Sequence, residues 1–169
     1  MKLILIRHAE AIVSNENRYL TSEGRQFFRK TARTMLKNGV EPNIIFTSPH
    51  IRAVQTADIL AETLSYCGPL IVKVTLKSDF DMRAFENLLN DYQGIEELVL
   101  VGHEPDMSIL VVSFLSLSER FDFVKGTAVF LRINGNDLQA PATFKWLAKG
   151  GKLITSRKEA FSPLSQSQT

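Results

Sequence analysis

The stretch LILIRHAEA at residues 3–11 joins a short apolar run directly to an arginine and a histidine. The four aliphatic residues LILI are typical of a β-strand. Arg7 and His8 follow without an intervening turn residue, so the strand would deliver both side chains to its carboxyl end. In an open α/β sheet, ligands bind outside the carboxyl ends of the strands. Residues 3–11 therefore predict the start of an α/β fold and the edge where a ligand would bind.

Three further β-type runs follow along the chain, and segments with helical periodicity separate them. The runs are NIIFT at 43–47, LIVKV at 70–74 and ELVLV at 97–101. The intervening periodicity predicts helices over 22–38, 50–65, 81–94 and 106–117. Thr21 or Ser22 is expected to cap the first helix and Asp81 the third. This alternation predicts βαβ units and a mainly parallel sheet.

The last third of the chain predicts a different arrangement. TAVFLRI at 127–133 and ATFKWLA at 142–148 flank a segment that contains Asn-Gly, a strong turn signal. These runs predict an antiparallel hairpin at one edge of the sheet. We expect a three-layer α/β/α architecture in a single domain, residues 1–155, followed by a mobile tail, residues 156–169.

Length and charge narrow the classes of function. The chain has 169 residues with 44% hydrophobic content, which suits one globular domain. A formal net charge of +2 is too small for a nucleic-acid-binding surface, and no apolar run reaches the roughly 18 residues of a membrane span. Cys67 is the single cysteine, so an internal disulfide is impossible. We expect a soluble cytoplasmic protein that binds neither nucleic acid nor membranes.

Polar residues of one chemical kind follow three of the expected parallel strands. Arg7 and His8 follow the first strand, and His103 follows the fourth after a glycine. His50 and Arg52 come just after the second strand, at the start of a helix. All three histidines of the chain would therefore meet at one rim of the sheet.

This combination suits a phosphoryl group. Two arginines supply forked donors for a tetrahedral oxyanion, and helix N-termini add backbone N–H groups. A histidine nitrogen can attack phosphorus if its other nitrogen donates to a carbonyl, which fixes the tautomer. A second, protonated histidine can then stabilise the charge that develops on the transferring oxygens.

Four segments in order make a resemblance to a known family specific. RHAEA at 7–11, LTSEG at 20–24, SPHIRAVQTA at 48–57 and GHEPDMS at 102–108 closely resemble the conserved blocks of the histidine phosphatase superfamily, also called phosphoglycerate-mutase-like. The chain has no lid insertion between the SPHIR and GHEPD blocks, and in this it is similar to the SixA-type phosphohistidine phosphatases.

The resemblance implies a role for each matched residue. His8 would take the phosphoryl group, Arg7, Arg52 and His103 would bind it, and water would hydrolyse the phosphohistidine. No metal or other cofactor is implied. The substrate would be a phosphorylated protein, such as a phosphotransfer domain, or a small phosphate ester.

Departures from the family pattern bear on the substrate. Ala9 replaces the usual glycine after the histidine, a small change. Phosphoglycerate mutases carry further polar ligands three and six residues after that histidine, where this chain has Ala11 and Ser14. Ser14 could still reach a phosphate oxygen, but a mutase substrate is disfavoured.

The proton donor for a leaving group is open at this stage. Glu104 directly follows the second histidine, as in some branches of the superfamily, and Asp79, Asp81 and Glu86 are alternatives. A phosphohistidine substrate needs such an acid less, because imidazole leaves a phosphoramidate more easily than an alkoxide leaves an ester. We hypothesise that Glu104 assists protonation.

Other interpretations are weaker. His50 is expected at the rim of the site, and Glu10 in a structural role. Asp79 and Asp81 form a DxD pair, but they do not directly follow a strand, and Asp81 suits a helix cap. Three functions stay open: a phosphatase for protein phosphohistidine, a broad phosphomonoesterase for small molecules, and a catalytically silent phosphate-binding module.

Overall fold

The structure is a computed structural model that describes residues 1–13, 17–134, 138 and 140–162. Within these residues seven strands form one sheet in the order β3-β2-β4-β1-β5-β6-β7. The strands are β1 (Lys2–Arg7), β2 (Ile44–Thr47), β3 (Leu70–Val72), β4 (Glu97–Gly102), β5 (Thr127–Arg132), β6 (Thr143–Lys149) and β7 (Lys152–Ile154). All four strands expected in the parallel part of the sheet are present.

The parallel half of the sheet places the motif residues side by side. Strand β4 pairs in parallel with both β1 and β2, and β3 pairs in parallel with β2. The register sets Arg7 opposite Gly102, and the His8 amide donates to the Gly102 carbonyl at 3.0 Å. Adjacent carboxyl ends therefore bring residues some 95 positions apart in the chain to one edge, as the sequence predicted.

The helices follow the predicted order, with shorter ends. They are α1 (Ser22–Lys37), α2 (Ile51–Leu64), η1 (Val74–Lys77), α3 (Met82–Asn90), α4 (Asp106–Leu115) and α5 (Arg157–Phe161). The Thr21 hydroxyl accepts a hydrogen bond from the Gly24 amide, and the Asp81 carboxylate accepts one from the Ala84 amide. Both predicted N-caps are confirmed. They could be predicted because a capping side chain acts on an amide only three residues away.

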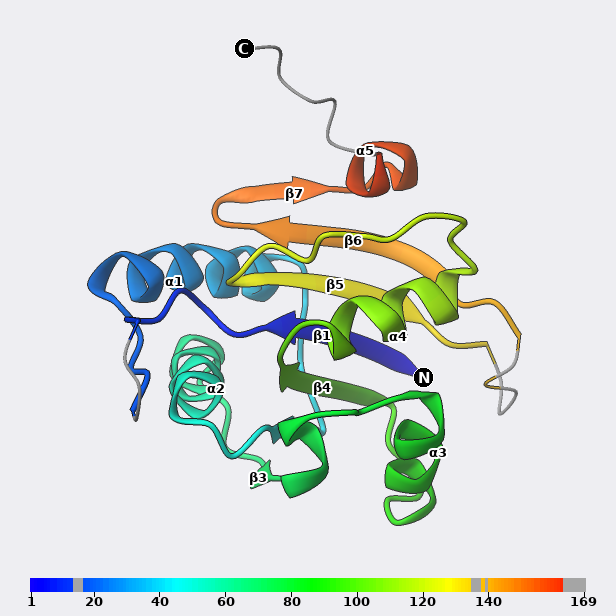
Figure 1. Ribbon diagram of the computed structural model, residues 1–169, viewed down its shortest axis with the longest axis horizontal. Coiled ribbons are helices and arrows are strands. Elements are labelled where there is room, and N and C mark those ends of the chain that lie inside the picture. Colours follow the sequence, from blue (N-terminus) through cyan, green and yellow to red (C-terminus); the bar gives the residue numbers. More distant parts are fainter. Residues whose placement is uncertain (14–16, 135–137, 139, 163–169) are drawn as a thin grey trace.

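Helices cover the sheet on both faces and give the predicted three layers (Figure 1). Alternate residues of β1 point to opposite sides: Ile4 and Ile6 pack in the core beneath α1 and α2, whereas Leu3 and Leu5 pack in the core that contains α3 and α4 residues. All four side chains have no exposed surface. The strand that carries the motif residues is thus buried from both sides.

The antiparallel hairpin is confirmed, but its position at the sheet edge is wrong. Strand β5 pairs antiparallel with β1 and with β6, so the hairpin lies between β1 and the edge of the sheet. The unpredicted strand β7 pairs with β6 and forms the actual edge. The Asn-Gly turn predicted for this hairpin falls partly outside the described residues.

We expected a mobile tail from residue 156, but its first residues form a helix that packs against the domain. Residues Arg157–Phe161 form α5, and the Phe161 ring packs edge-on against Phe121 at 4.9 Å and Phe144 at 5.0 Å between ring centroids. The Arg157 guanidinium also donates to the Leu115 carbonyl at 2.6 Å. Residues 163–169 of the expected tail lie outside the described residues. Of the helices described, none has the length and apolar character needed to span a membrane.

Candidate active site

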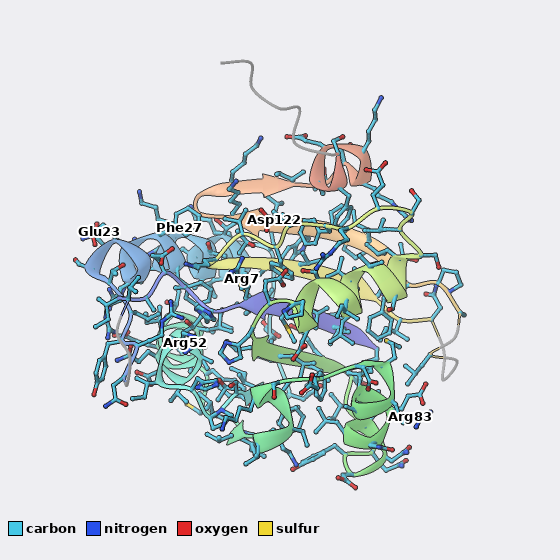
Figure 2. The ribbon with its side chains drawn as sticks, in the orientation of Figure 1. Arg7, Glu23, Phe27, Arg52, Arg83 and Asp122 are labelled. Carbon is cyan, nitrogen blue, oxygen red and sulfur yellow. The ribbon has the colours of Figure 1, made fainter. Side chains whose placement is uncertain are left out.

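The predicted site residues gather at the carboxyl edge of the parallel strands. Arg7 ends β1, His8 follows it, and His103 directly follows β4. Arg52 lies in the first turn of α2. Figure 2 shows Arg7 and Arg52 at this end of the sheet, whereas Arg83 on α3 lies at the opposite end. The arrangement therefore brings together four residues that three separate sequence blocks supply.

Hydrogen bonds fix the tautomer of His8. Its Nδ1 lies 2.7 Å from the carbonyl oxygen of Ala9, and because a carbonyl can only accept, Nδ1 carries the hydrogen. The opposite nitrogen, Nε2, accepts a hydrogen bond from Nε of Arg52 at 3.1 Å. His8 thus presents a lone pair on Nε2 toward the arginine, which is the geometry that the sequence analysis required of a nucleophile.

Burial keeps His8 uncharged. The pKa of His8 is lowered from 6.5 to about 4, mainly by desolvation and further by the positive charges of Arg52 and Arg7, although the hydrogen bond to Ala9 opposes the shift. At neutral pH the lone pair on Nε2 is therefore available.

The loop after His8 is held by hydrogen bonds to two neighbouring segments. The Ala9 amide donates to the Thr56 hydroxyl of α2 at 3.0 Å, and the Thr21 amide donates to the Glu10 carbonyl at 3.0 Å. Gly24 packs so closely that a Cβ there would lie 2.3 Å from the Glu10 carbonyl oxygen. The LTSEG segment is thus a structural support for the backbone beside His8.

His103 lies beside His8 and is also neutral. Its ring centroid is 5.1 Å from that of His8 and 4.9 Å from that of His50, and its Nε2 is 2.6 Å from the Ser48 hydroxyl. Burial is the largest cause that lowers its pKa to about 3, followed by the charges of nearby histidines and arginines. The expectation of a protonated second histidine therefore does not hold for the site without an anion.

Two buried nitrogens in the site have no hydrogen-bond partner among the described residues. They are Nε of Arg7 and Nδ1 of His103. A terminal nitrogen of Arg7 donates to the Phe123 carbonyl at 2.5 Å, which anchors the guanidinium and leaves Nε unpaired. Buried polar atoms are normally paired, so two unpaired buried nitrogens suit a site that takes up a polar ligand.

The Glu104 carboxylate makes its hydrogen bonds to Ser108 at the start of α4. It accepts them from the Ser108 hydroxyl and, at 3.1 Å, from the Ser108 amide. Burial raises the pKa of Glu104, and these two hydrogen bonds oppose that rise. As the sequence suggested, Glu10 has a structural contact, an ion pair with Lys125 at 2.8 Å. Ser14, the other tentative ligand, lies outside the described residues.

A short segment that we call the finger follows the loop after His8. We use this name for residues 11–13 and 17–20, where Ala11 and Leu20 form an antiparallel bridge and the Ile12 amide donates to the Tyr19 carbonyl. The Gln55 side chain of α2 accepts a hydrogen bond from the Leu20 amide at 2.8 Å. Ile12, Val13 and Tyr19 are exposed, Val13 almost completely at 94%.

The sequence analysis gave no role to Ser48, Thr56 or Asp106, all of which are buried polar residues near the site. The Asp106 carboxylate at the start of α4 accepts a hydrogen bond from the Phe80 amide at 3.1 Å. Asp81 caps α3, so the DxD interpretation loses one of its two carboxylates. Position was the available signal, because these three residues stand in the SPHIRAVQTA and GHEPDMS blocks, but the residues they contact lie far away in sequence.

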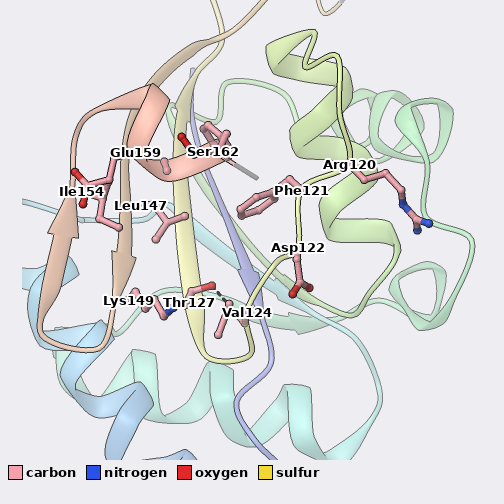
Figure 3. Close-up of a pocket in the computed structure, with 12 residues that line it drawn as sticks. Arg120, Phe121, Asp122, Val124, Thr127, Leu147, Lys149, Ile154, Glu159 and Ser162 are labelled. Atoms are coloured by element: carbon pink, nitrogen blue, oxygen red, sulfur yellow. Dashed lines mark hydrogen bonds between the residues drawn. The ribbon is translucent and has the colours of Figure 1, made fainter. Parts of the chain in front are cut away.

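A separate cavity lies under α5 and contains none of the four predicted residues. It measures about 210 Å³, and its lining includes Phe121, Leu147, Ile154 and Phe161 (Figure 3). We locate the active site by its histidines and arginines, because this mainly apolar cavity contains no histidine or cysteine that could act as a nucleophile. Among the described residues, no cluster of three or more histidine, cysteine or acidic side chains could hold a metal ion.

The fold and this histidine-arginine site define a phosphatase of the histidine type. The model of the histidine phosphatase superfamily (branch 1) matches residues 3–88, just over half of the chain. The chain belongs to this superfamily.

Individual relatives agree with this assignment. An uncharacterized protein of Picosynechococcus sp. is 28% identical over 149 residues, which cover 83% of this chain and 90% of that protein. The protein histidine phosphatase SixA complexed with tungstate has a similar fold, with a TM-score of 0.78 and 21% identity over 89% of this chain and 97% of that one. The alpha-ribazole phosphatase from Shigella flexneri matches with a TM-score of 0.64 and 18% identity over 93% of this chain and 97% of its own.

Proposed function

We propose that the protein hydrolyses protein phosphohistidine through a covalent phosphohistidine on His8, and that its substrate is a signalling protein such as a phosphotransfer domain. The observation that carries the proposal is the pair of hydrogen bonds on His8, from Nδ1 to the Ala9 carbonyl and from Arg52 to Nε2. Together they prepare one nitrogen to attack phosphorus.

The reaction proceeds in two in-line transfers. Nε2 of His8 attacks phosphorus while the bond to the substrate imidazole breaks, and that imidazole takes its proton from solvent. Water then attacks the phosphorus, the electron pair of the P–N bond returns to Nε2, and the proton of water passes to the phosphate product. Arg7, Arg52 and His103 bind the equatorial oxygens and offset their charge in both steps.

Arg52 has to exchange partners during this cycle. In the free site its Nε–H donates to the same Nε2 that attacks, at 3.1 Å. An arriving phosphoryl oxygen offers a charged acceptor, which forms a stronger hydrogen bond with a guanidinium than a neutral imidazole does. The arginine therefore transfers its donor to the substrate and leaves the lone pair free.

Two observations favour a phosphorylated protein as substrate. The finger exposes Ile12 and Val13, four and five residues after His8, together with Tyr19, which pairs with Ile12. Exposed apolar side chains that cluster at a site are typical of contacts with another protein. The Glu104 carboxylate is bound to Ser108, which suits a leaving imidazole because it needs no strong acid. We place this activity in the cytoplasm, consistent with a single, exposed, free cysteine at position 67.

A small-molecule phosphomonoesterase is the second candidate. One observation favours it: burial raises the pKa of Glu104, which is the direction that a proton donor to an alkoxide leaving group requires. In that case the enzyme would hydrolyse alkyl phosphates at rates comparable to those for phosphohistidine.

The deciding experiment compares turnover of a phosphohistidine-bearing phosphotransfer domain and p-nitrophenyl phosphate in the presence of a chelator. We expect preference for the phosphoprotein and an acid-labile phosphoenzyme after rapid quenching. The variant His8→Ala should form no phosphoenzyme, whereas His50→Ala should still form it, since the His50 side chain meets the site through a ring contact with His103 and its amide hydrogen bond to Ser48 survives the substitution. Equal or better hydrolysis of esters would favour the second candidate. Absence of turnover and phosphoenzyme in the wild type would leave the phosphate-binding module as the function.

A further inference from the structure

Ser48 is a fully buried hydroxyl that contacts the second histidine. It directly follows β2, and its amide donates to the Val101 carbonyl at 3.0 Å, which holds its backbone against β4. Its Oγ lies 2.6 Å from Nε2 of His103 and accepts a weaker hydrogen bond from the His50 amide at 3.3 Å. The hydroxyl thus lies between the starts of two helices and faces one ring nitrogen.

The hydrogens of this contact can be assigned from donor and acceptor capacity. A serine hydroxyl has one hydrogen to donate, and burying it without an acceptor is costly. Among the described residues, Nε2 of His103 is the acceptor that the Ser48 hydroxyl meets. When Ser48 donates to Nε2, that nitrogen holds the lone pair, and a neutral imidazole must then carry its hydrogen on Nδ1.

This assignment explains the two unpaired nitrogens of the site. With its hydrogen on Nδ1, His103 has a buried N–H that meets no partner among the described residues, and the Nε–H of Arg7 is a second one. Two unpaired buried donors in the site suit the oxygens of a phosphoryl group. The opposite tautomer would present a lone pair on Nδ1, which repels the same oxygen.

Building on the proposed function, we propose that Ser48 is a positioning residue that holds neutral His103 in the Nδ1–H tautomer, so that His103 donates a hydrogen bond to the phosphoryl group. The imidazole then needs no positive charge in order to bind the anion. If proton uptake accompanies the transition state, the Ser48 hydroxyl can turn and accept from the new Nε2–H.

The same tautomer gives the two histidines opposite roles. His8 uses Nδ1–H on the Ala9 carbonyl and keeps Nε2 for attack, whereas Ser48 occupies Nε2 of His103 and leaves its Nδ1–H to bind oxygen. The partner of each ring, a backbone carbonyl or a hydroxyl, therefore decides which histidine is the nucleophile. This accounts for a single phosphoryl acceptor in a site where two histidine rings lie 5.1 Å apart.

Nitrogen-15 NMR of the imidazoles tests the assignment without any substrate. The chain has three histidines, so three ring systems appear, and His103→Asn identifies one of them. In the wild type near pH 7 we expect His103 to carry its hydrogen on Nδ1, and in Ser48→Ala we expect the population to shift toward Nε2–H. Thr47→Val is the matched control: Thr47 is equally buried, but its hydroxyl donates to the Ser48 carbonyl.

Kinetics supply the second readout. Ser48→Ala should lower kcat about tenfold, the effect of one well-placed hydrogen bond, and Ser48→Thr, which retains a hydroxyl, should recover part of the loss. Thr47→Val should leave kcat within about twofold of the wild type. A wild-type spectrum with the hydrogen on Nε2, or one unchanged in Ser48→Ala, would overturn the role of Ser48. An intact tautomer in a protein that shows no turnover would instead overturn the proposed function.

Discussion

Arg52 donates a hydrogen bond from Nε to Nε2 of His8, the nitrogen that the proposed reaction uses for attack. The contact has two effects in the free protein. The hydrogen bond occupies the lone pair of Nε2 while no substrate is present. The charge of Arg52 also contributes to the lowered pKa of His8. In the proposed reaction, one guanidinium therefore both prepares His8 and binds the phosphoryl group that His8 attacks.

Removing the charge of Arg52 should change both the pKa of His8 and the binding of the phosphoryl group. In Arg52→Gln we expect the pKa of His8 to rise toward its ordinary value, because a positive neighbour that disfavours the imidazolium is gone. We also expect kcat/KM to fall about a hundredfold, the effect of losing a charged hydrogen bond to the phosphoryl group. NMR titration of the histidines and steady-state kinetics measure the two. Arg83→Gln, at the opposite end of the molecule, is the control, and similar behaviour of both variants would contradict the assignment (Figure 2).

The buried neutral His8 should make the protein sensitive to acid. Its pKa is about 4 when folded and ordinarily 6.5, so below pH 6.5 the unfolded chain binds more protons than the folded one. Stability is therefore complete above pH 6.5 and decreases as the pH falls toward 4, by about 2 kcal/mol at pH 5 from this residue. Urea unfolding at pH 7 and pH 5 measures the loss. We expect a smaller loss in His8→Gln, and an equal loss in both proteins would show that other groups cause it.

The close approach at Gly24 should make any side chain there disruptive. In Gly24→Ala the new Cβ would lie 2.3 Å from the Glu10 carbonyl oxygen, so the loop beside His8 has to move. We expect a lower melting temperature and at least a tenfold loss of kcat, because a shifted nucleophile attacks poorly. Gly151→Ala is the matched control, since among the described residues, its two chain neighbours aside, no heavy atom lies within 4 Å of the added Cβ. Normal activity in Gly24→Ala would show that the loop adapts without disturbing His8.

The finger should matter only for a protein substrate. Val13→Ser removes an exposed apolar side chain, so we expect kcat/KM for the phosphoprotein to fall about threefold to tenfold, and p-nitrophenyl phosphate hydrolysis to stay unchanged. Leu36→Ser, an exposed leucine in the last turn of α1, should affect neither. A parallel loss with both substrates would mean that Val13 supports the site rather than the partner.

Leaving groups of different basicity should reveal the role of Glu104. If its carboxyl group donates a proton, Glu104→Gln slows hydrolysis of an alkyl phosphate and spares phosphohistidine and p-nitrophenyl phosphate, whose leaving groups need less help. Ser108→Ala is the companion variant, because it removes one of the hydrogen bonds that hold the carboxylate at α4. Equal rates with Glu104→Gln across all three substrates would exclude Glu104 as the donor.

Local signals account for the parts of the fold that were predicted correctly. Thr21 and Asp81 act on amides three residues ahead, and strands β1 and β4 are complete in six residues each. Short elements were missed because they carry too little local signal. Strand β7 has only three residues, and it forms because β6 offers an unpaired edge, which is a tertiary cause.

The site shows the same division. Arg7, His8, Arg52 and His103 could be identified because each stands in a recognisable block at the end of a strand or the start of a helix. The contact between Ser48 and His103 could not, since it joins residues 55 positions apart and depends on the sheet register. Likewise, no pattern in the sequence indicates that Glu104 binds Ser108 rather than solvent.

The position of β1 also determines how the enzyme can lose activity. This strand has a hydrogen-bonded neighbour along each side and a packed core on each face, so its amides can exchange with solvent only through opening of the whole domain. His8 thus directly follows a strand in the interior of the sheet. Heat inactivation should therefore coincide with global unfolding, and the enzyme should retain a fully assembled catalytic centre until the entire fold collapses.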